Sequence, residues 1–371
     1  MTGDRLKIAL VCTAAPDAPG SMRAYAETLM DALVRFAPDL DVRRLSIGSP
    51  AGRGHWSARW ETTRLPWRAW RLDNDWPDVW HVLDGSRAYL TGLLRGAACV
   101  VTAHDLIPWL QAKGRFPGAP RASRAAALLW RLNARSMRKA DTLVCDSHST
   151  ARDAQECFQV PVSRCRVVPL PLRPSLARLA SEPSDMAREQ GLVLHLGNNG
   201  FYKWREQVLR IFARLDRARA RRLVMAGPPP TAGMRDLASQ LGITERVNWV
   251  GDPDDDRLAE LYRRASLLLF PSRYEGYGWP VLEAMSFGLP VVCSDRGSLP
   301  EVAGDACPCL DPDDLEAMAG VVSAILDEPL RAAALARAGL RRAGALCVAD
   351  FAATMCTIYR ELRPRRGVVA T

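Results

Sequence analysis

Two kinds of feature are missing from this chain of 371 residues, and each absence excludes a class of protein. None of its ten cysteines has a partner at the C-x2-C spacing of a zinc site, and the only close pair, Cys307 and Cys309, flanks a proline. No apolar run approaches the roughly 20 residues that cross a membrane, and the N-terminal residues lead into a strand-like segment instead of a signal peptide. We therefore expect buried free thiols and a cytoplasmic protein that is not integral to a membrane.

Acidic residues are missing from one long stretch. Between Gln111 and Ala140 there are eight cations and no Asp or Glu, so this stretch holds nearly the whole net charge of +9. If the range from Arg121 to Lys139 is a helix, at about 100° per residue, its cations fall within one arc of roughly 100°. An anionic membrane surface would relieve their repulsion, and a merely basic solvent-facing helix is the alternative. Nucleic acid fits less well, because no recognised nucleic-acid motif accompanies the cations.

The alternation of segments along the chain predicts two α/β domains. Short apolar runs alternate with longer amphipathic stretches, as parallel strands and their covering helices do. The predicted strands are Leu6–Cys12, 41–47, 78–83, Cys99–His104, 142–147 and 166–172, then Leu192–Gly197, 221–227, 247–251, Leu267–Ser272 and 290–295. Residues 169–190 mix prolines, serines and charges, which is typical of a linker. We expect doubly wound domains over 1–175 and 188–345 facing each other across a cleft, and a helix in 346–371 that packs back on the first domain.

The segment 275–283, EGYGWPVLE, places two glutamates eight positions apart around a turn that cannot be helix. Its two glycines let the backbone approach a ligand, and Pro280 fits the first turn of a helix, which would put Glu283 in that turn. Amides at a helix start attract an anion, while carboxylates accept hydrogen bonds from hydroxyls. A sugar nucleotide meets both demands. Paired acids also fit a metal or glycoside hydrolysis, and Glu283 alone would suit the helix dipole.

A family resemblance becomes specific at this segment. The string from Phe270 to Ala306, with its E-x7-E spacing, G-x-P turn and following L-P-E-V-x-G, resembles the carboxyl-half signature of family 4 retaining glycosyltransferases, which have the two-domain GT-B fold. LHLGNNGFYKWRE, from Leu194 to Glu206, resembles the family's strand, glycine turn and lysine, and VTAHDLIP, from Val101 to Pro108, resembles a first-domain motif. The likeness covers nearly the whole chain and is weakest over 49–77 and the linker.

The resemblance implies a role for each candidate residue. Glu275 would bind hydroxyls of the transferred sugar, Glu283 the ribose of the nucleotide, and Lys203 the diphosphate, whose charge grows as it departs. His104 would reach the sugar or the acceptor hydroxyl. The other implied contacts are Gly20, Asn198, Asn199, Gly251, Asp252, Gly276, Tyr277, Gly278 and Trp279. Since the family generally works without a metal, no metal or other cofactor is expected.

The implied activity is retaining transfer of a hexose from a nucleoside diphosphate sugar to a lipid-linked saccharide or oligosaccharide acceptor, at the inner face of the plasma membrane. A sugar-nucleotide 2-epimerase and a non-catalytic sugar-nucleotide or glycan-binding protein are the alternatives. Three departures from the family pattern bear on donor binding. One is that the turn after the first strand, APDAPGSM at 15–22, lacks the double glycine often seen. Asn198 and Asn199 stand where relatives often have an arginine, and Trp204 stands where a small or polar residue is common.

The remaining histidines and tryptophans allow structural interpretations. His81 and His195 lie inside predicted strands, where packing or a buried hydrogen bond is expected, and His148 follows a predicted helix cap at Ser147. Six tryptophans between His55 and Trp80 fit sugar stacking, a lipid interface or ordinary packing.

Overall fold

The structure, a computed structural model, describes residues 5–14, 20–48, 64–120 and 123–362. The chain divides into two compact units. Unit 1 comprises Met1–Arg173 together with Val348–Thr371, and unit 2 comprises Pro174–Cys347. The divisions after Arg173 and Cys347 lie close to the boundaries at 175 and 345 that the sequence predicts, and the chain returns to unit 1 after completing unit 2. Unit 2 begins at Pro174 and not at 188, because residues 174–181 of the predicted linker form a helix that packs on unit 2.

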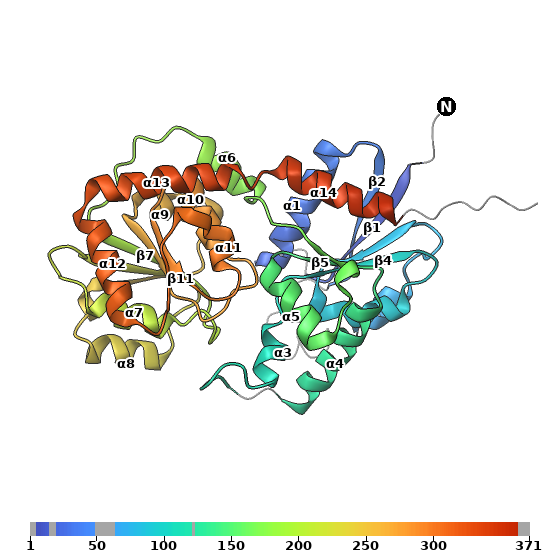
Figure 1. The fold of residues 1–371 in the computed structure, drawn as a ribbon, viewed down its shortest axis with the longest axis horizontal. Helices are drawn as coiled ribbons and strands as arrows, with labels where there is room; N and C mark the ends of the chain where they lie inside the picture. The colour runs from blue at the N-terminus through green and yellow to red at the C-terminus, as the bar shows by residue number, and fades with distance from the viewer. Residues whose placement is uncertain (1–4, 15–19, 49–63, 121–122, 363–371) are drawn as a thin grey trace, which may run out of the picture. The chain divides into compact units, whose positions relative to one another are not determined.

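Unit 1 is built around a six-stranded parallel sheet with the order β2-β1-β3-β4-β5-β6. Its strands are β1 (Leu6–Cys12), β2 (Leu40–Ser46), β3 (Val79–Val82), β4 (Ala98–Ala103), β5 (Thr142–Cys145) and β6 (Cys165–Val167). Its helices are α1 (Ser21–Phe36), η1 (Gly85–Leu93), α3 (Ile107–Ala112), α4 (Arg124–Lys139), α5 (His148–Phe158), η2 (Val162–Arg164) and α14 (Val348–Glu361). Figure 1 shows α1 and α14 on one side of this sheet and α3, α4 and α5 on the other.

Unit 2 repeats this plan, with a parallel sheet in the order β12-β11-β10-β7-β8-β9. Its strands are β7 (Leu192–Leu196), β8 (Arg222–Ala226), β9 (Val247–Val250), β10 (Leu267–Phe270), β11 (Val291–Ser294) and β12 (Cys309–Leu310). Its helices are α6 (Pro174–Ser181), α7 (Arg205–Ala213), α8 (Ala232–Gln240), η3 (Thr244–Arg246), α9 (Asp255–Arg264), α10 (Trp279–Ser286), α11 (Leu299–Ala303), η4 (Gly304–Ala306), α12 (Leu315–Asp327) and α13 (Pro329–Gly344). The predicted fold class, two doubly wound parallel-sheet units, is confirmed.

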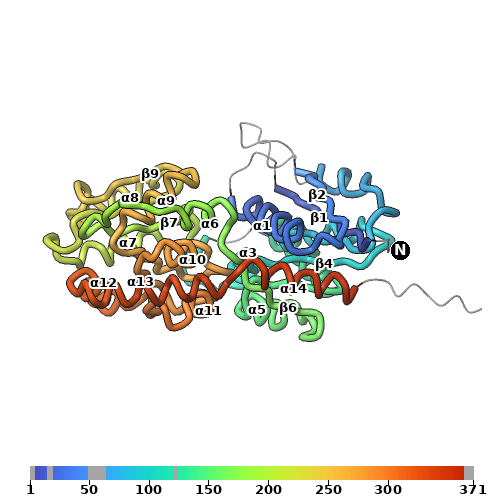
Figure 2. The backbone as a smooth tube through the Cα atoms, turned by 90° about the horizontal axis from the view of Figure 1, so that it is seen from above, coloured from blue at the N-terminus to red at the C-terminus, as the bar shows by residue number. Residues whose placement is uncertain are grey.

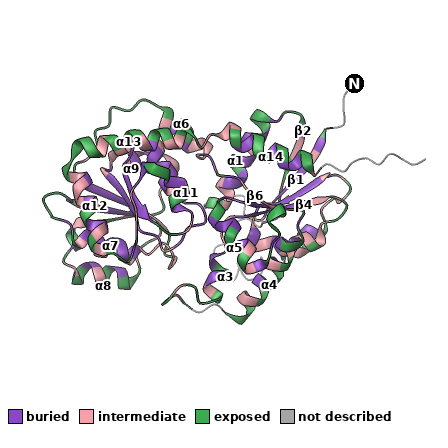
Figure 3. Ribbon diagram, viewed as in Figure 1, coloured by how far each residue is buried: buried purple, intermediate pink, exposed green. Residues whose placement is uncertain are grey.

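The central strands are apolar on both faces because helices cover both faces of each sheet. Every residue of β3, β5, β10 and β11 is buried, as a parallel sheet requires, and Figure 3 shows the middle strands of each sheet largely in the colour of buried residues. On one face of the unit 2 sheet, Phe212 of α7, Met234 of α8 and Met318 of α12 join a single core cluster. Burial of this kind is the main stabilising term of such a fold.

The C-terminal helix α14 belongs to the core of unit 1 although it is last in sequence. It packs along α1, and Figure 2 shows the two helices side by side. Phe351, Met355 and Tyr359 are buried in this contact. The Tyr359 hydroxyl also hydrogen-bonds to Nδ1 of His81 in β3, at 2.7 Å, so the helix is tied to the sheet by polar as well as apolar contacts.

Several predicted element ends need correction. Strand β6 stops at Val167 and β10 at Phe270, because the prolines that follow have no N–H for the sheet ladder. The short strand β12 was not predicted. The basic helix α4 begins at Arg124, where the Ser123 hydroxyl accepts from the amide of Ala126, and Arg121 lies outside the described residues. No helix among the described residues is long and apolar enough to cross a membrane.

Most of the histidine and thiol interpretations are confirmed. His81 and His195 are fully buried, and Ser147 caps α5 directly before His148. All ten cysteines are free thiols, but only five of them are buried and the other five are half-buried, so the expected burial holds for half of them. Of the six tryptophans, Trp56 and Trp60 lie outside the described residues, Trp80 is core, Trp76 is half-buried, and Trp67 and Trp70 are exposed.

Candidate functional site

The strand order of unit 2 locates a site before any side chain is considered. The chain runs outward from β7 through β8 and β9, then returns to add β10, β11 and β12 on the other side of β7. The point where the winding direction reverses therefore lies between β7 and β10. Ligands of open parallel sheets bind at such a switch point, beyond the carboxyl ends of the strands. The turn after β7 carries Lys203, and the loop after β10 carries Glu275.

Lys203 and Glu275 form a close ion pair at this switch point. The lysine Nζ donates to both carboxylate oxygens, at 2.8 and 2.9 Å, and the two side chains are 13% and 8% exposed. Lys203 Nζ also lies 5.1 Å from the centre of the Phe270 ring. Because the pair is largely shielded from water, each charge depends on the other for its stabilisation. The sequence predicted both residues as ligand contacts, and the structure brings them together.

Glu283 occupies the second turn of α10, not the first turn that the sequence predicts. The helix begins at Trp279, after Gly278 in a left-handed conformation, so Glu283 is its fifth residue. It is 3% exposed and accepts a hydrogen bond from the Tyr262 hydroxyl of α9 at 2.7 Å. Interaction with the helix dipole fades beyond the first turn. The dipole therefore does not account for a buried carboxylate here.

The loop that carries Glu275 is held by its backbone. The hydroxyl of Ser298 donates to the carbonyl oxygens of Glu275 at 3.0 Å and of Tyr277 at 2.6 Å. Gly297 has a φ of +61°, and a Cβ there would lie 2.5 Å from the Glu275 carbonyl oxygen. Only glycine fits this approach. The predicted contacts Gly276 and Tyr277 are both buried in this loop.

The side chains of the two asparagines after β7 form hydrogen bonds within and around the turn that follows this strand. Asn198 Oδ1 accepts from the amide of Gly200 at 2.8 Å, and its amide group donates to the Tyr202 hydroxyl at 3.0 Å. Asn199 donates to the carbonyl of Pro229 at 2.9 Å and accepts from Nη1 of Arg205. These bonds shape the turn that carries Lys203, and contact of the two asparagine side chains with a ligand stays a prediction.

Gly251 and Asp252, the predicted contacts after β9, are both exposed. No atom lies within 4 Å of the position that a Cβ on Gly251 would take, so open space borders this backbone. Trp279, the first residue of α10, is half-buried. The structure thus leaves these residues at the carboxyl edge of the sheet, where the sequence predicts them.

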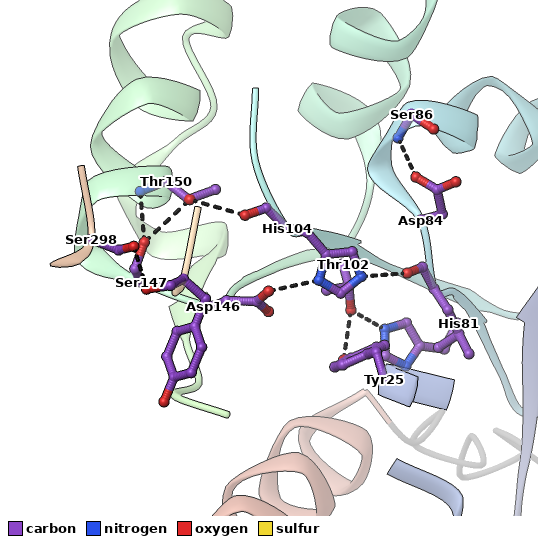
Figure 4. A network of polar contacts seen from close by, with 12 residues as sticks. Tyr25, His81, Asp84, Ser86, Thr102, His104, Asp146, Ser147, Thr150 and Ser298 are labelled. Carbon is purple, nitrogen blue, oxygen red and sulfur yellow. Dashed lines mark hydrogen bonds and ion pairs between the residues drawn. The ribbon is translucent and has the colours of Figure 1, made fainter. Parts of the chain in front are cut away.

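In unit 1, the predicted residue His104 follows β4 and is fixed at both ring nitrogens. Nδ1 donates to the Asp146 carboxylate at 2.6 Å, and Nε2 donates to the Leu83 carbonyl oxygen at 2.9 Å (Figure 4). Burial opposes a charge on the ring, but the Asp146 carboxylate outweighs it and raises the pKa of His104 to about 9. His104 is therefore an imidazolium at neutral pH, with an orientation set inside unit 1.

A buried chain of hydrogen bonds lies beside this imidazolium. The Thr102 hydroxyl bonds to Nε2 of His81 at 2.7 Å and to the Tyr25 hydroxyl at 2.9 Å, as Figure 4 shows. The Tyr25 ring meets the His104 ring edge-on, with centroids 4.6 Å apart. Burial lowers the pKa of His81 to about 3, so its ring is neutral. The network fixes the Tyr25 ring against the His104 ring, while Asp146 holds His104 through Nδ1.

The predicted contact Gly20 lies directly before α1, at the reversal of winding between β1 and β3. It has a φ of +136°, which glycine tolerates, and no atom would obstruct a Cβ there. The backbone at Gly20 is exposed, as a contact to a ligand requires. Residues 15–19 of the same turn lie outside the described residues.

Sequence reasoning missed several residues that complete these arrangements. Asp146 stands directly after β5, among the strand-end positions where the sequence predicts ligand contacts, but its bond to His104 is visible only in the structure. Ser298 lies inside the family-like string, but nothing in the sequence shows that its hydroxyl braces the Glu275 loop. Tyr262 precedes Glu283 by 21 positions on another helix, and its contact is visible only in three dimensions.

Within the described ranges, no group of three or more His, Cys, Asp or Glu side chains is placed to hold a metal ion. The carboxylate of Glu275 has a lysine as its partner, and that of Glu283 has a tyrosine. What the unit 2 site offers instead is a cation, two buried carboxylates and the start of a helix. Such a set can bind a ligand that is both anionic and rich in hydroxyl groups.

Comparison with known proteins agrees with this chemistry. Residues 180–342 match the family model "Glycosyl transferases group 1", and residues 9–175 match "Glycosyltransferase Family 4". An O-antigen chain mannosyltransferase B of Escherichia coli is 46% identical over 98 residues, which is 26% of this chain and 26% of that protein. A D-inositol 3-phosphate glycosyltransferase of Acidothermus cellulolyticus is 28% identical over 62% of this chain and 56% of its own length. The chain thus spans between a quarter and just over half of these relatives.

One solved structure shows the same fold over nearly the whole chain. A sucrose-phosphate synthase from Thermosynechococcus elongatus superposes with a TM-score of 0.75 at 21% identity, covering 96% of this chain and 99% of that one. At this identity the likeness bears on the fold alone. The two family models together take in most of the residues of both units.

Proposed function

Because this chain belongs to family 4 of the glycosyltransferases and has their GT-B fold, we propose that it transfers a hexose from a nucleoside diphosphate sugar, with retention of configuration and without a metal. The proposed acceptor is a lipid-linked saccharide or polysaccharide, met at the cytoplasmic face of a membrane. A relative named for O-antigen chain mannosylation supports this class of acceptor. The observation that carries the proposal is the Lys203–Glu275 pair at the switch point of unit 2.

In the proposed complex, groups of the donor replace Glu275 as the partner of Lys203 and replace Lys203 as the partner of Glu275. The diphosphate would draw Lys203 away from Glu275, whose two oxygens would then accept hydrogen bonds from sugar hydroxyls. Glu283, held by Tyr262, would accept from the ribose. The acceptor hydroxyl would attack the anomeric carbon on the face that the diphosphate leaves, and a phosphate oxygen would take its proton. A fixed cation beside the leaving group stabilises the charge that develops there.

His104 enters this proposal as a fixed positive charge. With both nitrogens donating to Asp146 and Leu83, the ring is not a base. An imidazolium near the sugar or the diphosphate would act through its charge and its ring edge. The contact of His104 with the sugar or acceptor stays a prediction.

The proposed membrane surface is the exposed face of α4. Arg124, Arg131 and Arg135 lie on it beside Leu128 and Leu132, which are 59% and 49% exposed. This mixture of cations and apolar side chains suits an anionic lipid surface. Near the end of the helix, Arg131, Arg135 and Arg138 line a pocket of about 400 Å³ whose described lining includes Trp109 and Phe158 and no acidic residue. A lipid phosphate fits such a set of guanidinium groups.

Turnover of a donor panel tests the proposal. The purified protein is incubated with UDP-, GDP- and ADP-sugars in EDTA, with and without a membrane lipid extract, and free nucleoside diphosphate is measured. We expect release from one donor, raised by lipid and lost in Lys203→Ala and Glu275→Ala. An epimerised donor without acceptor would indicate a 2-epimerase instead. Binding without any turnover would indicate a non-catalytic binding protein, and either result contradicts the proposal.

A further inference from the structure

Two cysteine side chains meet between neighbouring strands at the edge of the unit 2 sheet. Cys293 of β11 is opposite Cys309 of β12 in the strand register, and their Sγ atoms are 3.5 Å apart. Strand β12 is the last in the sheet order, so it has a neighbouring strand on one side only. Cys293 is fully buried, whereas Cys309 is half-buried and so partly open to solvent. This contact between two thiols has no part in the proposed transfer reaction.

The backbone positions of this pair suit a disulfide bond. Adjacent strands lie about 4.8 Å apart, and disulfides join Cα atoms that are roughly 4.4 to 6.8 Å apart. Rotation of the two side chains, with little movement of the backbone, therefore brings the sulfurs to bonding distance. A second pair of neighbouring thiols, Cys145 and Cys165, is offset, because Cys165 faces Leu143 in the register. Its Cα atoms are then roughly 8 Å apart, which is too far for a disulfide.

The two thiols of the facing pair differ in acidity, as an attacking and a resolving thiol do. A hydrogen bond from the Cys293 thiol lowers the pKa of Cys309. The same bond, together with burial, raises the pKa of Cys293. Nearby, burial raises the pKa of Cys307 to about 12, so that side chain stays a thiol. Since the thiolate is the form that reacts with peroxides, Cys309 reacts first and Cys293 is placed to react second.

Strand β11 connects this pair to the loop that carries Glu275. The residue after Cys293 is Ser294, whose buried hydroxyl donates to the Ser272 carbonyl oxygen at 2.6 Å, at the start of that loop. Further along the same segment, Ser298 donates to the Glu275 carbonyl oxygen at 3.0 Å. A movement of β11 toward β12 therefore acts on both of these contacts.

We propose that Cys293 and Cys309 are an oxidation site, at which hydrogen peroxide joins the two sulfurs as a disulfide that shifts the loop of Glu275 and lowers transfer. The Cys309 thiolate attacks one peroxide oxygen and the O–O bond breaks. With a proton from solvent, one water leaves and Cys309 becomes a sulfenic acid. The Cys293 sulfur then attacks the Cys309 sulfur, and the S–O bond breaks as a second water leaves with the Cys293 proton. The two sulfurs together lose two electrons, which the peroxide oxygens gain.

Peptide mapping tests the disulfide itself. Folded wild type is treated with hydrogen peroxide, the remaining thiols are alkylated in denaturant, and linked peptides are identified by mass spectrometry. We expect a linkage of Cys293 to Cys309 that dithiothreitol removes and that is absent in Cys309→Ser and in Cys293→Ala. Cys165→Ser is the matched control, because Cys165 is also half-buried beside a buried thiol, and it should form the linkage as wild type does. Absence of the linkage in oxidised wild type would overturn the inference.

Two measurements on the oxidised proteins test the effect on the loop. Transfer should fall at least about tenfold when wild type and Cys165→Ser are oxidised, because a shift on the order of 1 Å in a group that binds substrate is costly. Dithiothreitol should restore the rate, and Cys309→Ser should keep its rate in peroxide. Hydrogen exchange of residues 273–278 should change on oxidation in the same two proteins and not in Cys309→Ser.

The effect on transfer rests on the proposed function of the unit 2 site, whereas formation of the disulfide does not. A linkage that forms while transfer and the exchange of 273–278 stay unchanged would overturn the control of the loop. An equal loss of transfer in Cys309→Ser would show that peroxide acts elsewhere, and would overturn it too. If wild type turns over no donor, the proposed function fails, and peptide mapping with hydrogen exchange still decides the inference.

Discussion

At the scale of single residues, Lys203 and Glu275 depend on each other for stability as well as for chemistry. Replacing Lys203 by Ala should lower transfer by on the order of a hundredfold, the usual cost of removing one electrostatic stabiliser. It should also lower the free energy of unfolding by about 3 kcal/mol, because the shielded Glu275 carboxylate loses its partner. Denaturant titration and initial rates measure the two effects separately.

A double variant separates these two effects within one protein. Lys203→Met combined with Glu275→Gln removes both charges and keeps two side chains of similar size. We expect most of the lost stability to return while transfer stays at or below the rate of Lys203→Ala. Recovery of transfer in the double variant would contradict a direct role for the pair. Failure to recover stability would show that the unpaired Glu275 carboxylate does not cause the loss of stability in Lys203→Ala.

The imidazolium of His104 makes stability depend on pH. Its pKa is raised from 6.5 to about 9, so between these values the folded protein keeps a proton that the unfolded chain has released. The stabilisation is complete below pH 6.5 and is lost as the pH rises through 9. It amounts to about 3 kcal/mol, from the size of the shift. Urea titrations at several pH values should show this decline in wild type and not in Asp146→Asn. A flat wild-type profile would contradict the assignment.

The sequence indicated candidate site residues better than it indicated their partners. Lys203, Glu275 and His104 are candidates because they follow strands and match family motifs. The sequence does not show that Asn199 braces Arg205, because the two side chains meet only when the turn after β7 folds. The same holds for Glu283 and Tyr262, which come from different helices.

At the scale of elements, the loop that carries Glu275 requires glycine at position 297. Gly297→Ala would force a left-handed alanine and place a Cβ 2.5 Å from the Glu275 carbonyl oxygen. We expect a loss of stability of about 2 kcal/mol and a large loss of transfer, because the backbone must shift. Gly320→Ala is the matched control. It lies inside α12 with no atom within 4 Å of the new Cβ, and should stabilise the protein by up to about 1 kcal/mol.

Thermal melts of the two alanine variants, together with their transfer rates, measure this difference. Similar melting temperatures in both variants would contradict the close approach at Gly297. Loss of stability without loss of transfer would show that the loop tolerates a shift of Glu275.

The cationic face of α4 predicts binding to anionic membranes. Changing Arg131, Arg135 and Arg138 together to Gln should abolish flotation with vesicles that contain anionic phospholipid, and neither form should float with neutral vesicles. The control changes Arg235, Arg337 and Arg341, three exposed arginines of unit 2, to Gln and alters the net charge equally. Equal loss of flotation in both triple variants would show that net charge, not α4, is responsible.

The elements themselves were largely predictable, while their ends were not. Runs such as Leu6–Cys12 are buried strands because their apolar residues are continuous and bounded by turn residues. Strand ends depend on which amides find partners in the sheet, and prolines cut short β6 and β10. Strand β12 has two residues, too few for any periodic signal.

At the scale of the whole molecule, α14 makes unit 1 depend on the end of the chain. A protein that stops at Cys347 lacks the buried side chains Phe351, Met355 and Tyr359 and leaves His81 without its tyrosine. We expect unit 1 to lose protection from hydrogen exchange while β7 to β11 of unit 2 keep theirs. Tyr359→Phe is the milder variant, and it should cost about 1 kcal/mol by leaving one buried nitrogen unpaired. Unchanged exchange in unit 1 of the shortened protein would contradict this dependence.

The two-unit plan followed from the sequence because each half repeats the alternation of strands and helices. Sheet order did not follow from it, since the alternation of strands and helices does not show which strands lie side by side. That order is what places the loops of Lys203 and Glu275 next to each other. The functional argument therefore needs the topology of unit 2 as well as its motifs.

The most direct test of this account is the rate of sugar transfer, in EDTA, by wild type and by Lys203→Ala with the donor that wild type uses. Metal-independent transfer that falls on the order of a hundredfold in the variant, at saturating donor, is the result we predict. Wild-type transfer that vanishes in EDTA and returns with a divalent metal would contradict it, as would a Lys203→Ala variant that turns over at the wild-type rate.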